Sequence, residues 1–176
     1  MKQSHSMSMT HSFDGLLDVN DDEEMQDQLK SNFITFLRME RMNNRTLDFK
    51  KVINAVEPLA YSHALIVLNK KELVTKLLSF ARPSKEVAEA GCTTGVVIQG
   101  KVVDLLIALI KDLRQDIYQE FIEEIMPTVI SIINVQSLQL LDHVFTLFSF
   151  SFKYLLKPIR DDIQNFYTIY QELLVH

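Results

Sequence analysis

A chain of 176 residues, 47% of them hydrophobic, is long enough for one domain with a sizeable core. Only four glycines and four prolines interrupt it, which favours helices over architectures built from strands and turns. The single cysteine, Cys92, cannot form an internal disulfide, so nothing in the composition supports a disulfide-stapled secreted domain.

The net charge of −5 is distributed unevenly along the chain. Residues 1–29 carry one Lys against seven acids, residues 30–85 carry eleven basic residues against four acids, and residues 86–176 carry six against twelve. A basic segment inside an acidic chain indicates either an anionic partner or ordinary solvated helix faces. The polar N-terminus lacks the apolar core of a signal peptide, and no uncharged stretch is long enough to predict a membrane span.

In chain order, residues 1–20 have no apolar periodicity and are predicted to form a disordered polar and acidic tail. Residues 21–81 predict a set of basic N-terminal helices, and Asn69 is expected to cap the last of them. Three of the four glycines fall in the next twenty residues, so a loop or insertion is predicted over 82–99. Residues 100–176 return to helical periodicity and are predicted to form helical pairs.

Residues 138–156 predict a helix with apolar side chains on most of its circumference. Asp142 and Lys153 argue against a membrane helix, and the ring-bearing stripe lacks the cations that base stacking requires. Such a helix is expected to be covered by neighbours on two sides. The predicted structural core is the stripe that recurs every three or four residues, with the members Leu141, Phe145, Phe148, Phe152 and Leu155.

The spacing between successive helical pairs indicates the fold. The helices over 117–133 and 137–157 form one pair, and the next pair opens near residue 160. This period fits the roughly 40–47 residues of a HEAT unit. The predicted fold is therefore all-α, an armadillo-like α-solenoid of HEAT-like pairs with about seven to eight helices.

Three stretches together resemble a known family: DLLIALIKDLRQDIYQEF, VFTLFSFSFKYLLKPIRDDI and FYTIYQELL. They are similar to the N-terminal region of the U3 small nucleolar RNA-associated protein 20 family, also called down-regulated in metastasis, whose members are very large HEAT-repeat proteins. The similarity covers most of residues 30–176. The chain departs from the family's pattern at Gln119, His143 and Leu156-Lys157. The residues that carry the resemblance are Asp112, Leu113, Tyr118, Phe145-Thr146-Leu147, Phe152-Lys153-Tyr154-Leu155, Asp161 or Asp162, and Leu173-Leu174.

The resemblance implies a non-catalytic scaffold of the small-subunit processome, or 90S preribosome, which acts in nucleolar processing of pre-ribosomal RNA. It implies pre-ribosomal proteins, pre-rRNA and U3 small nucleolar RNA as partners, with no cofactor, membrane or small-molecule substrate. It also implies that a further repeat follows His176 in a longer protein. The residues agree with a non-enzyme, because no phosphate-binding glycine loop and no metal-spaced Cys/His set is present.

A set of basic residues in the first half of the chain is the candidate site for RNA or acidic partners. Its first three members, Arg38, Arg41 and Arg45, are spaced by three and four residues, so a continuous helix would align them in one row. An α-solenoid adaptor in trafficking or nuclear transport, without RNA contact, is the alternative function. The candidate residues are Arg38, Arg41, Arg45, Lys50, Lys51, Lys70, Lys71 and Lys76.

Overall fold

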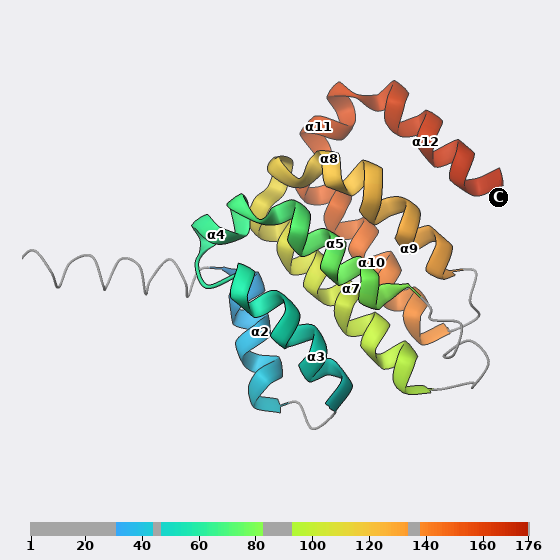
Figure 1. Cartoon of the computed structure of the whole chain (residues 1–176). Coiled ribbons are helices and arrows are strands. Elements are labelled where there is room, and N and C mark those ends of the chain that lie inside the picture. Colours follow the sequence, from blue (N-terminus) through green and yellow to red (C-terminus); the bar gives the residue numbers. More distant parts are fainter. Residues whose placement is uncertain (1–30, 44–46, 83–92, 134–137, 176) are drawn as a thin grey trace, which may run out of the picture.

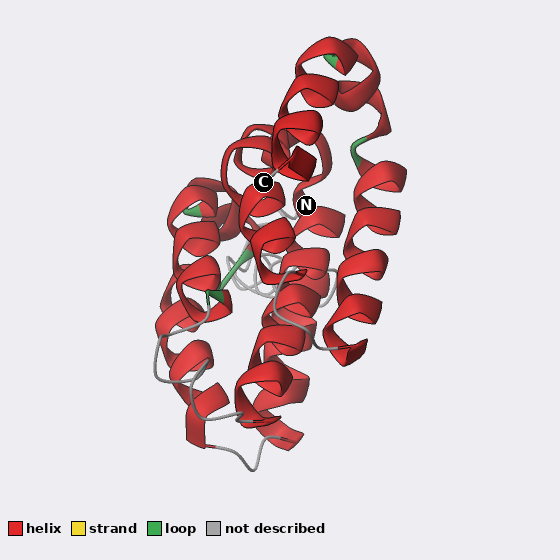
Figure 2. Ribbon diagram, turned by 90° about the vertical axis from the view of Figure 1, so that its right-hand side faces the viewer, coloured by secondary structure: helices red, strands yellow, loops and turns green. Residues whose placement is uncertain are grey.

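The computed structural model describes residues 31–43, 47–82, 93–133 and 138–175, and the regular structure in these ranges is entirely helical (Figure 1). In Figure 2 the described connections are short green segments between red helices. The prediction of an all-α protein is confirmed for this part of the chain.

Helix α7 (Thr93–Leu113) is the central element of the protein. It contacts α2 (Asn32–Asn43), α5 (Lys70–Ala81) and α10 (Leu138–Tyr154). Every residue from Leu105 to Ile110 is buried, because neighbours cover α7 on several sides. Each large apolar side chain buried in this way contributes about 1.5–3 kcal/mol to folding.

The long helices form two layers (Figure 1). In one layer α7 lies between α2 and α10, and in the other α5 lies between α3 (Leu47–Val56) and the segment Tyr118–Ile133. The chain passes from the second layer to the first twice, from α5 to α7 and from Tyr118–Ile133 to α10. In the α2–α3 pair the chain passes in the opposite direction, from α2 in the first layer to α3 in the second.

Two short elements connect α3 to α5: the 3-10 helix η2 (Glu57–Leu59) and α4 (His63–Leu68). Ser62 caps α4, since its Oγ accepts a hydrogen bond from the Leu65 amide at 3.3 Å. Asn69 stands at the N-cap position of α5, as predicted, but its side chain makes no cap bond. Its Nδ2 donates to the Leu59 carbonyl at 3.3 Å and so holds the preceding turn in place.

The segment between α7 and α10 is irregular. A 3-10 turn, η3 (Arg114–Ile117), and the short α8 (Tyr118–Glu120) lead into the π-helix η4 (Phe121–Ile125) and then α9 (Met126–Ile133). Pro127 stands one residue after the start of α9 and has no backbone N–H to donate. The widened turn directly before it is a common way for a helix to accommodate an interrupted hydrogen-bond ladder.

The predicted loop over 82–99 is wrong in its last part, because α7 already begins at Thr93; residues 83–92 lie outside the described ranges. Two of the three glycines that suggested a loop, Gly95 and Gly100, lie inside the helix, and Gly91 lies outside the described residues. At Gly100 the reason is close packing: a Cβ there would lie 2.9 Å from His143 Nε2 on α10. A glycine at this position lets α7 and α10 approach one another.

The predicted orientation of α10 is also wrong. Phe145 and Phe152, expected in the core, are 68% and 48% exposed, and Leu141 and Phe148 are half-buried. Leu155 is fully buried, as predicted. The side facing α7 consists of smaller side chains at helical spacing, namely Leu140, Val144, Leu147 and Ser151.

The physical reason is that α10 lies at the edge of its layer. Its aliphatic side meets α7, whereas no other helix among those described covers most of its aromatic side. The chain continues through α11 (Leu156–Asp161) into α12 (Ile163–Val175), which reaches α10 through an edge-to-face contact of Phe166 with Phe152.

Candidate functional site

The basic residues predicted to bind RNA or acidic partners lie on three helices. Arg45 lies outside the described residues, so the structure describes only the first two members of the predicted row of three arginines. The others are Arg38 and Arg41 on α2, Lys50 and Lys51 on α3, and Lys70, Lys71 and Lys76 on α5.

Two of these cations are held by nearby carboxylates. Arg41 Nη1 lies 2.6 Å from Glu57 Oε1, and Lys76 Nζ lies 2.9 Å from Glu72 Oε1, one turn away on α5. Both pairs are largely exposed, so each contributes at most about 1 kcal/mol to stability. An anionic partner would have to compete with these carboxylates.

Lys70 has a structural role that the sequence did not reveal. Its Nζ donates to the backbone carbonyl of Asp116 and lies 3.7 Å from Glu120 Oε1. Glu120 is only 8% exposed, and its Oε2 has no hydrogen-bond partner in the described part of the chain. Lys70 is therefore the cation that compensates a buried carboxylate, which makes it a poor candidate for RNA contact.

Lys50 and Lys71 remain the best candidates for an anionic partner. Both side chains are exposed, and within the described ranges neither makes a hydrogen bond or an ion pair. Their helices, α3 and α5, are neighbours in the same layer.

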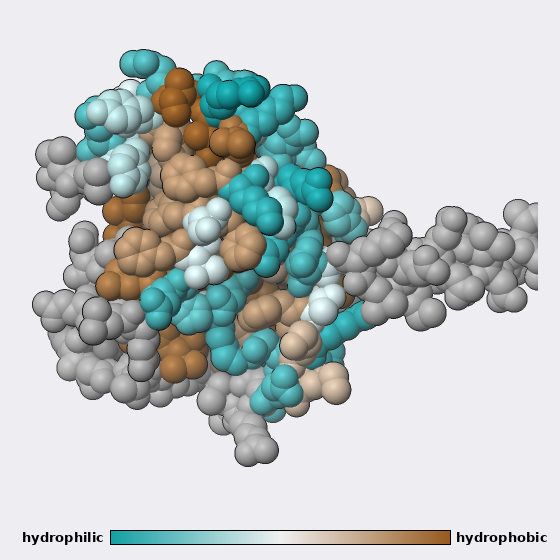
Figure 3. Space-filling view, turned by 180° about the vertical axis from the view of Figure 1, so that it is seen from behind, coloured by the Kyte–Doolittle hydropathy of each residue, from teal (hydrophilic) through white to brown (hydrophobic). Residues whose placement is uncertain are grey.

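A second candidate site lies at the other end of the protein, where α10, α11 and α12 expose large apolar side chains. Figure 3 views the molecule from behind and shows hydrophobic residues gathered over this face. Phe166 joins the helices, since its ring contacts Phe152 edge-to-face at 6.0 Å and stacks on Tyr170 at 6.3 Å. We call this area the aromatic surface; its exposed members are Phe145, Phe152, Leu156, Ile163, Tyr167 and Tyr170.

Three exposed cations lie on the same helices, α10 and α11, as members of the aromatic surface. Lys153 and Lys157 follow Phe152 and Leu156 directly in the sequence, and Arg160 lies one turn further along α11. Arg160 is paired with its neighbour Asp161 at 3.3 Å. Lys153 and Lys157 are thus the cations of α10 and α11 for which no ion pair with a described residue is present.

Tyr118 anchors the start of α12 to the rest of the protein. Its hydroxyl donates to Asp162 Oδ2 at 3.4 Å, across 44 residues of sequence. Burial and the nearby Asp162 carboxylate both disfavour the phenolate, which raises the pKa of Tyr118 to about 12. The hydrogen bond joins α8 to the junction between α11 and α12.

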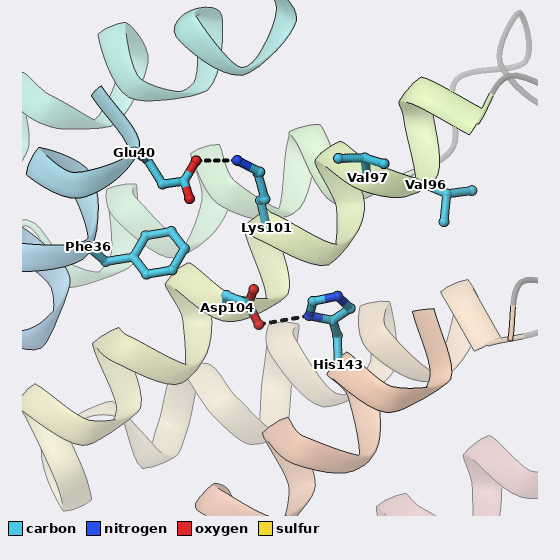
Figure 4. Close-up of a pocket in the computed structure, with 7 residues that line it drawn as sticks. All are labelled: Phe36, Glu40, Val96, Val97, Lys101, Asp104 and His143. Atoms are coloured by element: carbon cyan, nitrogen blue, oxygen red, sulfur yellow. Dashed lines mark hydrogen bonds and ion pairs between the residues drawn. The ribbon is translucent and has the colours of Figure 1, made fainter. Parts of the chain in front are cut away.

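A pocket of about 270 Å³ opens between α2, α7 and α10 (Figure 4). It contains an ion pair between Lys101 and Glu40 and a hydrogen bond between His143 and Asp104, whose Nδ1 and Oδ1 atoms lie 2.8 Å apart. Lys101 Nζ also lies 5.0 Å from the centre of the Phe49 ring. The residues that line the pocket are Phe36, Glu40, Val96, Val97, Lys101, Asp104 and His143.

The ionisable groups of the pocket satisfy one another, so they connect helices and leave no reactive group unpaired. The Lys101–Glu40 pair joins α7 to α2, and the Asp104–His143 pair joins α7 to α10. The sequence around His143 gives no signal of its partner, Asp104, which lies 39 residues earlier. Only the packing of α10 on α7 brings the two side chains together.

No protein-family model matches the chain. In the described ranges, no three His, Cys, Asp or Glu side chains gather into a set that would hold a metal ion. None of the helices in these ranges has both the length and the apolar character needed to cross a bilayer.

Proposed function

We propose that the chain is a non-catalytic scaffold segment in small-subunit ribosome biogenesis, which acts in the nucleolus on pre-ribosomal RNA processing. The support for this assignment is the resemblance carried by Asp112, Leu113 and Tyr118 and by Phe152 to Leu155. Two of these residues have structural roles that suit a repeat protein: Asp112 caps α2, and Tyr118 fixes the start of α12.

The aromatic surface is the observation that carries the scaffold assignment. Phe145 on α10 and Ile163 and Tyr167 on α12 are each more than half exposed, and the two helices meet at the ring contact of Phe152 with Phe166. Contiguous apolar patches on soluble proteins commonly mark sites of protein–protein contact. Aromatic residues are also the side chains most enriched at interface hot spots. We therefore assign a protein partner to this surface.

We further propose that the two later helical pairs are HEAT-like units. The α5–α7 pair begins at Lys70 and the next pair begins at Tyr118, a spacing close to the roughly 40–47 residues of HEAT repeats. In this arrangement α7 and α10 would be successive inner helices. The reversed order of α2 and α3 means that the repeat pattern does not extend to the N-terminal pair.

RNA contact is the less supported part of the proposal. Lys50 and Lys71 are available for phosphate groups, whereas Arg41, Lys70 and Lys76 are engaged by carboxylates. This engagement favours the alternative function, an α-solenoid adaptor in trafficking or nuclear transport that binds only proteins.

Affinity purification of the full chain from cells tests the assignment. We expect co-recovery of pre-ribosomal RNA and processome proteins. Substituting Phe145→Glu together with Tyr167→Glu should abolish protein recovery, because both changes place charge in the aromatic surface. Tyr61→Glu with Leu68→Glu, which alters exposed apolar residues elsewhere, is the matched control.

A second pair of variants separates the two candidate functions. Lys50→Glu with Lys71→Glu should weaken RNA recovery without affecting proteins, and the remaining RNA association should fall steeply with salt. Recovery of trafficking or nuclear-transport proteins alone, with no pre-ribosomal RNA, would establish the adaptor and refute the ribosomal assignment.

A further inference from the structure

We propose that the acidic segment FDGLLDVNDDEE, residues 13–24, docks on the aromatic surface and covers it when no partner is bound. The occupant of this surface is thus a segment of the same chain. The inference concerns the regulation of the surface to which the proposed function assigns a partner. Docking is measured on the isolated chain, so its failure and the failure of the proposed function are distinguishable.

The segment has the composition that the aromatic surface requires. Phe13, Leu16 and Leu17 are spaced as i, i+3 and i+4, which one helical turn would place on a single side. Acidic residues surround these three side chains, so an apolar centre is combined with negative borders. This is the recurring pattern of a peptide helix that binds a hydrophobic groove. The acids of the segment are Asp14, Asp18, Asp21, Asp22, Glu23 and Glu24.

The charges of the two parts are complementary. Lys153, Lys157 and Arg160 lie on α10 and α11, the helices that carry Phe145, Phe152 and Leu156, and all three side chains are exposed. Residues 1–29 have seven acids against one Lys. Docking would bring these opposite charges together around an apolar contact, which favours this surface over an apolar patch without cations.

The segment leaves the folded part at a suitable place. Ser31, the first described residue, donates from its Oγ to Asp112 Oδ2 at 2.6 Å, near the end of α7. The neighbouring Lys111 Nζ lies 3.9 Å from the centre of the Phe150 ring, and Arg114 lies 6.0 Å from that of Tyr154. The chain therefore enters the fold on the α2 side of α7, at the same end of α7 that meets the C-terminal half of α10.

The connecting residues are long enough to reach any point of the surface. The chain from Leu17 to Ser31 spans up to about 45 Å when extended. Helix α10, with its 17 residues, is only about 25 Å long. A tether of this length gives an effective concentration on the order of millimolar, so a contact made by three apolar side chains suffices to populate the docked state.

A tryptophan introduced at position 13 tests the proposal by its fluorescence, because the sequence contains no other Trp. In the full chain carrying Phe13→Trp, docking should shift the indole emission to the blue and reduce its quenching by acrylamide at least twofold. Adding Phe145→Ser and Tyr167→Ser should return both signals to those of an exposed indole. Tyr61→Ser with Leu68→Ser, at exposed apolar positions outside the aromatic surface, should change neither.

Charge-reversal variants and added salt test the electrostatic contribution to docking. Lys153→Glu with Lys157→Glu should lower the docked fraction, and raised salt should lower it in the parent chain. Lys50→Glu with Lys71→Glu is the matched charge control and should leave it unchanged.

Three results would overturn the proposal. The first is an indole that is fully exposed in the parent chain. The second is a protected indole that does not respond to the substitutions at Phe145 and Tyr167, since it would then be docked elsewhere. The third is protection that rises with protein concentration, which would identify a second copy of the chain as the occupant.

Discussion

The carboxylate of Asp112, near the end of α7, accepts a hydrogen bond from the backbone amide of Phe33 at 2.9 Å and thereby caps the start of α2. Its other oxygen accepts from the amide of Asn32, also at 2.9 Å. The first amides of a helix have no partner within the helix itself. Here a side chain about 80 residues away supplies the cap, so the start of α2 depends on α7 being in place.

Replacing Asp112 should therefore destabilise the protein. We expect Asp112→Ala to lower the free energy of unfolding by about 2 kcal/mol, since it removes a charged cap and leaves several donors without an acceptor. Urea unfolding followed by circular dichroism measures the change. Asp116→Ala, at an exposed carboxylate in the following turn, should stay within about 0.5 kcal/mol. Equal effects of the two changes would contradict the capping role.

Gly100 and His143 should be energetically coupled. A methyl group at Gly100 would displace the His143 ring and break its hydrogen bond to Asp104, at a cost of about 1 kcal/mol. Alanine in a helix is also about 1 kcal/mol better than glycine. Gly100→Ala should thus be nearly neutral in the parent chain but stabilise a His143→Ala variant by about 1 kcal/mol. A four-member double-mutant cycle in urea tests this, and identical effects in both backgrounds would show that the ring is not displaced.

The orientation of α10 can be tested with two substitutions. Leu147 is fully buried against the core, so Leu147→Ala should cost about 2–5 kcal/mol through lost transfer energy and the cavity left behind. Phe145→Ala removes a larger side chain that is 68% exposed and should cost less than about 1 kcal/mol. Thermal or urea unfolding ranks the two, and the reverse order would mean that the aromatic side of α10 faces the core.

Tyr118 should make stability depend on alkaline pH. Its pKa is raised from 10.0 in an unfolded chain to about 12 in the fold, so folding favours the neutral phenol. The contribution to stability is complete below pH 10 and is lost as the pH rises through about 12. Tyr118→Phe should therefore lose less stability between these pH values than the parent chain. A difference titration of phenolate absorbance between the two proteins should show one group ionising near pH 12, and its absence would contradict the buried hydrogen bond to Asp162.

The boundaries of several helices could be predicted because they depend on neighbouring residues. The helix α5, for example, follows Asn69 as expected. The start of α7 could not be predicted in this way. Local propensity assigns Gly95 and Gly100 to a loop, whereas the close approach of His143 on another helix makes a glycine suitable at the second position.

The candidate sites depended still more on tertiary contacts. The sequence identified the cations and the aromatic residues, but it could not show that Lys70 lies beside the buried Glu120 or that Asp104 meets His143. Each of these pairs joins residues from different helices. No spacing rule within one helix relates them.

The sequence by itself determined that the protein is helical, because residue propensities and a period of about 3.6 are properties of each segment alone. It also showed that α10 has apolar side chains on two sides. Only the tertiary structure decided which side is buried. The aliphatic residues Val144 and Leu147 let α10 pack on α7, whereas the larger rings of Phe145 and Phe152 remain on the side that faces away from it. Which neighbour a helix packs against depends on the whole arrangement of helices, and hydrophobicity along one helix does not contain that information.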